Sequence, residues 1–324
     1  MCTAIGMHMG RFYFGRTLDY DFSYGEEVTI TPRSFPLTFR HQKTMEHHYA
    51  ILGMARVEEG YPLYFDAINE AGLAMAGLNF VGNAAYNKAQ QGKCNIATFE
   101  FIPWILGQCA SASGARNCLK KLNLTEDAFS DKFPPAQLHW IIADQKESIV
   151  VEATKKGLQV YENPLGVLTN NPEFEAQMFR LNDYMALTPG EPQNNFSQKV
   201  DLKLYSRGMG ALGLPGDLSS QSRFVRASFT KLNSRIDDPD REAVSQFFHV
   251  LGSVEQVNGC CRVGEGSYEK TLYTSCCDAD TGIYYYTTYE NRQITAIHMH
   301  NVDLRRTELF RYPLLHQEQI RRGN

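Results

Sequence analysis

The sequence has neither a long hydrophobic run nor a block of basic residues. No apolar stretch approaches the roughly 18–20 residues that a membrane-spanning helix needs, and the N-terminus lacks the basic and apolar regions of a secretory leader. Lys and Arg total 32 against 36 Asp and Glu, and the net charge of −4 leaves no positive surface for nucleic acid. We therefore expect a cytoplasmic protein that binds neither nucleic acid nor membranes.

The chain also lacks the spaced cysteine pairs of a structural zinc site and the glycine-rich loop of a nucleotide site. Its eight cysteines include the doublets Cys260-Cys261 and Cys276-Cys277. Adjacent residues on a strand point to opposite faces, so each doublet offers only one inward ligand. We interpret the doublets as small buried hydrophobic residues and expect reduced thiols, no metal and no cofactor.

The hydrophobic pattern predicts one layered α+β domain over residues 1–324. Strand-like segments dominate the first 80 residues and return at 138–161 and 271–300. Helices are predicted over 98–109, 112–123, 173–186, 221–234 and 240–251. Because neither an internal repeat nor a Pro/Gly/Ser-rich linker divides the chain, we predict two sheets covered by helices in a single domain.

The cysteine at position 2 directly follows Met1. Removal of Met1 would leave a thiol and a free α-amine on one residue. An α-amine has a pKa of about 7.7–8, so a useful fraction is neutral at physiological pH and can accept the thiol proton. This combination suits acyl transfer by a nucleophilic cysteine, although a small residue at position 2 is by itself weak evidence.

The first two predicted strands bring charged residues towards Cys2. A hairpin with a short turn places one of residues 16–18 opposite Cys2, and this delivers Arg16 to the thiol, where a guanidinium favours the thiolate. Asp19 is an odd number of positions from Arg16 and would face the other side of a regular strand. We expect a bend or bulge near Thr17-Leu18 that lets the carboxylate orient the α-amine. The alternative is a surface ion pair between the two charged residues.

A set of motifs occurs in order along the chain: Met1-Cys2-Thr3-Ala4, Gly15-Arg16-Thr17-Leu18-Asp19, Gly77-Leu78-Asn79-Phe80, Leu168-Thr169-Asn170-Asn171-Pro172 and Ser222-Arg223-Phe224-Val225-Arg226. Together they resemble the choloylglycine hydrolase family, which comprises bile salt hydrolases and penicillin V acylases, over essentially the whole chain. The resemblance implies an N-terminal nucleophile hydrolase, with an αββα sandwich of two antiparallel sheets, that matures by loss of Met1. It also implies a homotetramer.

The resemblance assigns a catalytic set by motif: Cys2, Arg16, Asp19, Asn79, Asn170 and Arg223. Cys2 would be the nucleophile and its α-amine the base, with Arg16 and Asp19 supporting them. The proposed mechanism needs no histidine, because the α-amine carries the proton.

The other three residues of this set also match positions with known roles in the family. Asn79 and Asn170 match positions of an oxyanion hole, where each amide donor can contribute about 3 kcal/mol. Arg223 matches a charged residue that organises the site. A slip of the motif match would substitute Asn171 or Arg226, and without the resemblance these segments would be read as a turn and a helical surface.

The same motifs resemble the bile-salt branch more than the penicillin branch, chiefly at Asn79 and at the opening Met1-Cys2-Thr3-Ala4. This implies hydrolysis of the amide bond of glycine- or taurine-conjugated bile salts. The 19 Phe and 17 Tyr can line an apolar steroid pocket, and we assign residues 22–24, 61–63 and 133–135 to it. An acylase for penicillin V or N-acyl homoserine lactones, and a non-catalytic protein that binds apolar ligands, stay open as alternatives.

Overall fold

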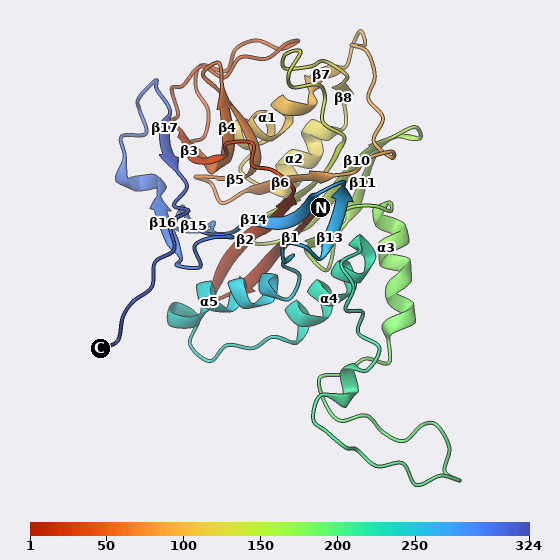
Figure 1. Cartoon of the computed structure of the whole chain (residues 1–324). Coiled ribbons are helices and arrows are strands. Elements are labelled where there is room, and N and C mark those ends of the chain that lie inside the picture. Colours follow the sequence, from red (N-terminus) through yellow and green to blue (C-terminus); the bar gives the residue numbers. More distant parts are fainter.

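A computed structural model describes residues 1–324 and contains two large antiparallel sheets that share a core (Figure 1). The strands of the first sheet lie in the order β12-β1-β2-β14-β15-β16, and β13 pairs with β14. Their bounds are β1 Cys2–Met9, β2 Arg11–Tyr20, β12 Val167–Leu168, β13 Cys261–Gly264, β14 Ser267–Asp278, β15 Ile283–Thr288 and β16 Thr295–His298. Because β1 lies between two other strands, Cys2 enters the interior of the molecule.

The second sheet has the strand order β11-β10-β9-β6-β5-β4-β3-β17. Its strands are β3 Glu27–Thr31, β4 Ile51–Glu58, β5 Tyr61–Asn69, β6 Ala74–Asn79, β9 Leu138–Ala143, β10 Ser148–Thr154, β11 Gly157–Glu162 and β17 Phe310–Pro313. A separate parallel pair is formed by β7 Cys94–Ala97 and β8 Leu122–Thr125.

Helices cover the outer face of each sheet (Figure 1). They are α1 Phe101–Gln108, α2 Ala112–Leu119, α3 Phe174–Arg180, α4 Ser220–Asn233 and α5 Pro239–Gly252, and short 3-10 turns occupy Thr98–Glu100, Leu181–Tyr184, Met209–Ala211 and Met299–Asn301. α1 and α2 pack on the second sheet, whereas α4 and α5 pack on the first. The predicted αββα sandwich is therefore confirmed. None of the helices combines the length and apolar content that crossing a bilayer requires.

The second sheet is buried on both faces because its strands face two different cores. In β4, Leu52 and Met54 belong to the core shared by the two sheets, whereas Ile51 and Ala55 belong to the core beneath α1 and α2. Alternating side chains thus go to opposite layers, and both sets must be apolar. This explains why the strand segments of this region read as continuous hydrophobic runs.

The predicted helix over 112–123 is too long. α2 begins behind Ser111, whose Oγ accepts a hydrogen bond from Gly114 N (3.1 Å), and the helix ends at Leu119. Residues 122–125 instead form β8, in which Leu122 and Leu124 are buried. Pairing with β7 overrides the helical preference of this segment, which its local pattern could not reveal.

The interpretation of the cysteine doublets is correct for one doublet only. Cys276 and Cys277 lie in β14 at the centre of the first sheet and are completely buried. Cys260 is exposed and Cys261 is partly exposed, because this doublet begins β13 beyond the covered part of the sheet.

A long loop between α3 and α4 projects away from the layered body (Figure 1). Residues 185–219 contain one short 3-10 turn and no strand. The loop carries exposed apolar side chains, of which Met185 is 80% exposed, Phe196 83% and Tyr205 80%.

Candidate active site

β1 and β2 form the hairpin that positions Cys2. Their antiparallel register pairs Cys2 with Leu18 and Ala4 with Arg16, so the partner of Cys2 falls within the predicted range. Paired residues share a face of the sheet, and so do residues two apart on a strand. Cys2 and Arg16 are therefore diagonal neighbours on the face that looks towards the second sheet.

Arg16 reaches across to the second sheet. Its Nη1 donates to the carbonyl oxygens of Gly77 (2.6 Å) and Phe65 (3.3 Å), while Nη2 is buried without a hydrogen-bond partner. The side chain is only 1% exposed. Burial acts to lower the pKa of Arg16, but the nearby acidic groups, with Cys2 first among them, outweigh it and raise the pKa. A permanent buried cation thus lies beside the thiol.

Asp19 faces the side of the first sheet away from Arg16. Its carboxylate accepts hydrogen bonds from Thr271 Oγ1 (2.6 Å) and Thr17 Oγ1 (3.2 Å). The predicted bulge in β2 is wrong: β2 keeps a regular register with β1, and the irregularity lies in β14 just after Thr271. The surface ion pair is wrong as well, because Arg16 and Asp19 are both buried on opposite faces of one strand.

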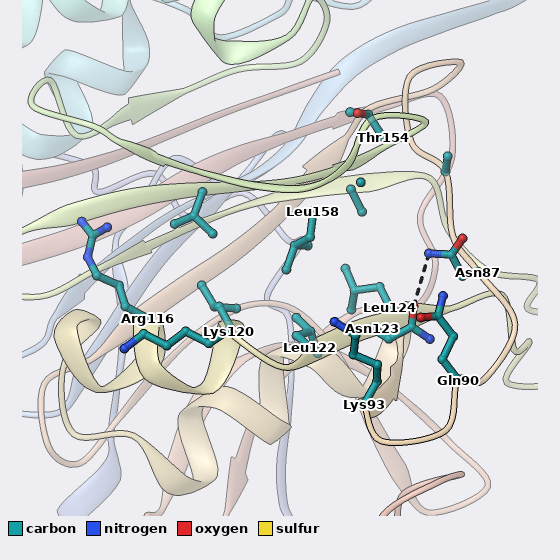
Figure 2. Close-up of a pocket in the computed structure, with 15 residues that line it drawn as sticks. Asn87, Gln90, Lys93, Arg116, Lys120, Leu122, Asn123, Leu124, Thr154 and Leu158 are labelled. Carbon is teal, nitrogen blue, oxygen red and sulfur yellow. Dashed lines mark hydrogen bonds between the residues drawn. The ribbon is translucent and has the colours of Figure 1, made fainter.

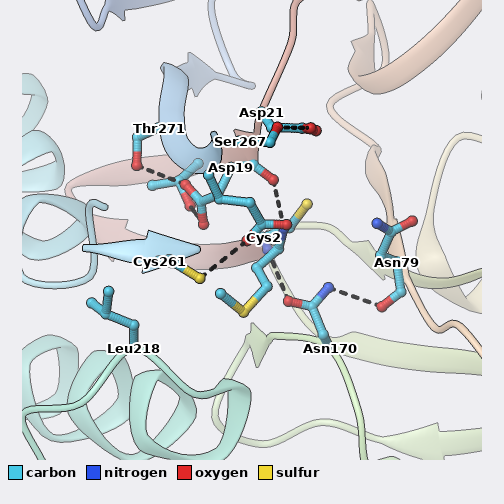
Figure 3. Close-up of polar contacts among 12 residues, drawn as sticks. Cys2, Asp19, Asp21, Asn79, Asn170, Leu218, Cys261, Ser267 and Thr271 are labelled. Carbon is cyan, nitrogen blue, oxygen red and sulfur yellow. Dashed lines mark hydrogen bonds and ion pairs between the residues drawn. The ribbon is translucent and has the colours of Figure 1, made fainter. Parts of the chain in front are cut away.

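Asn170 and Arg223 hold the backbone of Cys2. Figure 3 shows Asn170 beside Cys2. Cys2 N donates to Asn170 Oδ1 (2.8 Å), so Asn170 and not Asp19 accepts from the backbone nitrogen of Cys2. Arg223, from α4, donates through Nη1 to Cys2 O (2.5 Å) and through Nη2 to Asn170 Oδ1 (2.7 Å). Burial lowers the pKa of Arg223, and Asp19 opposes that shift.

Asn79 and Asn170 are joined by a hydrogen bond, and Asn79 lines the cavity at Cys2. Asn170 Nδ2 donates to Asn79 O (2.9 Å) and keeps a second N–H. The side chain of Asn79 lines the cavity at Cys2 and makes no hydrogen bond of its own. Its amide is therefore free to donate to a ligand oxygen near the thiol.

The neighbouring alternatives lie elsewhere. Asn171 Nδ2 donates to Val81 O (2.8 Å), and Arg226 donates to Ser253 O (2.7 Å) and Pro215 O (2.6 Å). Neither side chain bonds to Cys2, so the structure brings Asn170 and Arg223 to the backbone of Cys2 and leaves these two out.

An apolar cavity of about 180 Å³ opens at Cys2 between the two sheets. Its walls come from β2, β5, the turn at 98–100, α1 and the loop before β9, and they include Leu18, Tyr20, Phe65, Ile102, Phe129 and Trp140. A second hollow of about 390 Å³ shares Phe99 and Phe129 with this cavity and adjoins it. Cys2 thus lines a cleft whose walls are mostly aromatic and aliphatic.

The three loops assigned to the pocket contribute to it unequally. Tyr24, Leu63, Phe133 and Pro134 line the cavity at Cys2. Tyr61 lines only the adjoining hollow, whereas Phe22 lines neither and is 52% exposed.

Asp66 is a buried charged residue of the site that the motifs did not reveal. Its carboxylate accepts hydrogen bonds from Tyr273 OH (2.6 Å), Tyr284 OH (2.7 Å) and Ser275 Oγ (3.0 Å), all from the first sheet. Burial raises the pKa of Asp66, and the positive charge of Arg16 opposes that shift. A lone Asp within the apolar strand 61–69 was the signal that could have found it.

Glu269 is a second acidic residue that the motifs missed. It accepts a hydrogen bond from the Met1 ammonium at 2.9 Å, and the same ammonium donates to Asp19 O (2.5 Å). Met1 O in turn accepts from Asp19 N (2.9 Å). Met1 is thus anchored as an extension of β1, directly ahead of Cys2.

A larger cavity, of about 600 Å³, is shown in Figure 2, and Cys2 is not among the residues that line it. It is bounded by α2, β8, β10, β11 and the loop around Asn87, and it contains none of the predicted site residues. The chain brings together no cluster of three or more His, Cys, Asp or Glu side chains that could hold a metal ion.

The two antiparallel sheets between helical layers, with a buried cysteine at the start of a central strand, define an N-terminal nucleophile hydrolase fold. A model of the linear amide C–N hydrolases of the choloylglycine hydrolase family matches residues 2–312. The chain belongs to this family, which confirms the resemblance seen in its motifs and makes it an amide hydrolase by class.

Relatives cover the chain from end to end. It is 56% identical over 319 residues to a bile salt hydrolase/transferase of Lactiplantibacillus plantarum, covering 98% of each chain. It is 37% identical to a bile salt hydrolase/transferase of Clostridium perfringens, covering 96% of each chain. The crystal structure of a variant of conjugated bile acid hydrolase from C. perfringens superposes with a TM-score of 0.93 at 36% identity, covering 100% of both chains. Penicillin V acylase from Agrobacterium tumefaciens has the same fold, with a TM-score of 0.72 at 20% identity over 96% of this chain and 90% of that one.

Proposed function

We propose that this protein hydrolyses the amide bond of conjugated bile salts and releases glycine or taurine and a free bile acid. The observation that carries the proposal is the position of Cys2, which lines an aromatic and aliphatic cleft together with the side chain of Asn79. An apolar acyl group suits the cleft, and the amide to be cleaved then lies at the thiol. The full-length similarity to proteins named bile salt hydrolases supports this substrate.

In the proposed first step, loss of Met1 turns Cys2 N into the α-amine that accepts the thiol proton. The thiolate sulfur bonds to the amide carbon, and the carbonyl electron pair moves to oxygen. The free side-chain amide of Asn79, with the second N–H of Asn170, donates to this oxygen. Asn170 Oδ1, already an acceptor for Cys2 N, keeps the amine oriented.

In the second step the C–N bond breaks, and the nitrogen of the amino acid takes the proton from the α-ammonium. This leaves a thioester between Cys2 and the bile acid. The α-amine then accepts a proton from water, whose oxygen attacks the thioester carbon. The C–S bond breaks, the bile acid leaves, and the thiol regains its proton.

The buried charges around Cys2 have supporting roles in this proposal. The cation of Arg16 favours the thiolate and lowers the barrier to its formation. Arg223 fixes the Cys2 carbonyl, while Asp19 balances the charge of Arg223 on the same face of the sheet.

The test uses untagged protein whose N-terminal Cys2 has been verified by mass spectrometry. Release of glycine and taurine from glycocholate and taurocholate is compared with cleavage of penicillin V. We expect faster turnover of the bile salts, and loss of several orders of magnitude of activity in Cys2→Ser, because an alcohol ionises far less readily than a thiol. Preferred cleavage of penicillin V would reassign the substrate, and full activity of Cys2→Ser would refute thiolate catalysis.

We further propose that the protein is a homotetramer held in part by the loop at 185–219. Its apolar side chains at Met185, Phe196 and Tyr205 are at least 80% exposed, and several such side chains on one loop are typical of a surface that another subunit covers. Light scattering is expected to give four times the chain mass for the wild type and a smaller mass for Phe196→Ser with Tyr205→Ser. An unchanged mass in the double variant would exclude the loop from the interface.

The cytoplasm is the proposed location. All eight cysteines are free thiols in the structure, including Cys109 and Cys118, whose sulfurs are 3.5 Å apart, and this suits a reducing compartment. Fractionation of a culture into cytoplasm, envelope and medium tests this location. Recovery of the protein from the medium would contradict it.

A further inference from the structure

Two cysteines outside the candidate active site lie side by side in the outer helical layer. Cys109 directly follows α1 as its C-cap, and Cys118 lies in the last turn of α2. Their Sγ atoms are 3.5 Å apart and share a hydrogen bond. Neither residue lines the cavity at Cys2.

We propose that Cys109 and Cys118 form a reversible disulfide when a peroxide oxidises Cys118. The two sulfurs must approach by about 1.5 Å to reach the S–S bond length of about 2.05 Å. The connecting segment is short and includes the start of α2, so the encounter needs no rearrangement of distant elements. The pair is therefore a modification site for small oxidants.

The two thiols differ in exposure and in pKa, and this difference indicates which one reacts with the peroxide and which one then forms the disulfide. Cys109 is only 4% exposed, whereas Cys118 is partly exposed. The hydrogen bond from the Cys109 thiol lowers the pKa of Cys118 to about 7, and the same contact raises the pKa of Cys109. Cys118 is thus the accessible thiolate that meets the oxidant, and Cys109 is the thiol that resolves it.

The reaction balances with one peroxide. The Cys118 thiolate attacks one oxygen of hydrogen peroxide, the O–O bond breaks, and the departing hydroxide takes a proton to become water. The Cys109 sulfur then attacks the sulfenic sulfur, an S–S bond forms, and the S–O bond breaks. This second hydroxide leaves with the Cys109 proton as water, so two thiols are oxidised, and two added thiols reverse the bond.

The surroundings of Cys109 hold it in place for this reaction. Asn69 Nδ2 donates to Cys109 O and to Leu106 O, each at 2.7 Å, and thereby ties the end of α1 to the second sheet. On the α2 side, Ser111 caps the helix and Leu119 is buried. A bridge would join α1 to α2 over a layer that is already ordered, so it stabilises the fold and leaves Cys2 untouched.

Cys94 is the one other thiol that could compete. It begins β7, and the nearby Cys118 contributes to the raised pKa of Cys94 after the larger effect of burial. Because its own thiol is held protonated, we expect Cys94 to remain reduced. The matched variants are therefore Cys109→Ser, Cys118→Ser and Cys94→Ser, which replace one sulfur each at nearby positions.

The experiment treats the full-length protein with hydrogen peroxide, blocks free thiols with N-ethylmaleimide and digests with trypsin. Cleavage after Arg116 and Lys120 separates the peptide 94–116, which holds Cys94 and Cys109, from 117–120, which holds Cys118. We expect a cross-linked pair in the wild type and in Cys94→Ser that disappears in Cys109→Ser, in Cys118→Ser and after dithiothreitol. The bridged protein should unfold about 2–4 °C above the reduced one.

Cys260 is exposed and serves as the internal control, because its modification proves that the oxidant acted. A cross-link that persists in Cys109→Ser would assign the bridge to Cys94 and overturn the proposal. Oxidation of Cys260 with no cross-link, or conversion of Cys118 to sulfinic acid without a bridge, would overturn it as well.

Discussion

The side chain and the backbone of Cys2 have different surroundings. Its thiol points into an apolar cleft beside Arg16, while its backbone nitrogen and oxygen are bound to Asn170 and Arg223 on the polar side. Strand geometry produces this division, because the side chain stands out of the sheet, whereas the backbone N–H and C=O point within the sheet plane. In the proposed mechanism, loss of Met1 would therefore let one residue present both the nucleophile and the base to the substrate.

Asn79 has a side-chain amide that lines the cavity at Cys2 and has no hydrogen-bond partner in the protein. Replacing it by Ala should lower kcat on conjugated bile salts about 10²–10³-fold, with a smaller effect on KM, because the amide stabilises charge that develops only in the transition state. Steady-state kinetics on glycocholate measures the effect, with Asn83→Ala in the following loop as the control. A change in KM alone would place Asn79 in substrate binding and not in the oxyanion hole.

β2 and β14 approach unusually closely where Gly15 precedes Arg16. A Cβ on Gly15 would lie 2.0 Å from Ser275 O, and the neighbouring Arg16 N donates to Ser275 Oγ (3.1 Å). Only a residue without a side chain allows the two backbones to pair here. Gly15 therefore allows β2 to lie against β14, and this packing fixes the strand that carries Arg16.

Gly15→Ala should destabilise the protein by about 3 kcal/mol or more, because two paired backbones must separate. Gly252→Ala is the matched control, since nothing lies within 4 Å of its added Cβ and it ends a helix. The control should change stability by less than about 1 kcal/mol. Denaturant unfolding measures the loss of stability in both variants. An equal loss in the two would mean that β2 and β14 separate at no cost and would contradict the prediction.

α4 is fastened at its far end by Lys231, whose Nζ donates to Leu165 O. Burial lowers the pKa of Lys231 from 10.5 to about 8. Between these two values the unfolded chain holds a proton that the folded chain has lost, so stability rises with pH across this window. Below about pH 8 the side chain is charged in both states.

Lys231→Met should remove this pH dependence. The free energy of unfolding of the wild type is expected to rise relative to the variant by about 1–3 kcal/mol between pH 8 and 10.5. Lys203→Met, at a side chain that is 80% exposed, should behave as the wild type. If the free energy of unfolding depended on pH in the same way in the wild type and in Lys231→Met, the Lys231 amine would have its ordinary pKa.

At the scale of the whole molecule, we propose that residues 1–324 form one domain. β1 and β2 at the start of the chain pair with β12 and β14 from its second half, and β17 near the end pairs with β3. The protein should therefore unfold in a single transition, with fluorescence and far-ultraviolet circular dichroism tracing the same curve. Two separated transitions would contradict a single domain.

Retention of Met1 should leave the fold intact and abolish activity. The ammonium of Met1 is already accommodated by Glu269 and Asp19 O, but an amide at Cys2 N cannot accept a proton. Insertion of Lys between Met1 and Cys2 blocks removal of Met1, and mass spectrometry, circular dichroism and glycocholate turnover then test the result. Activity with a retained Met1 would require another base.

The sequence by itself determined the features that depend on local patterns. Alternation and a short turn predicted the β1–β2 hairpin and brought Arg16 to Cys2, and the ordered motifs predicted the family and the sandwich. Asn170 and Arg223 were named from the motifs, although their contacts with Cys2 were not.

Only the tertiary structure decided what depends on strands that are distant in sequence. The register of β14 against β2 placed the irregularity opposite Asp19, and the packing of β5 beneath the first sheet put Asp66 near Arg16. The meeting of α1 and α2 likewise set Cys109 against Cys118. Local periodicity states which face a residue takes, but the partner on that face is chosen by the pairing and packing of the whole chain.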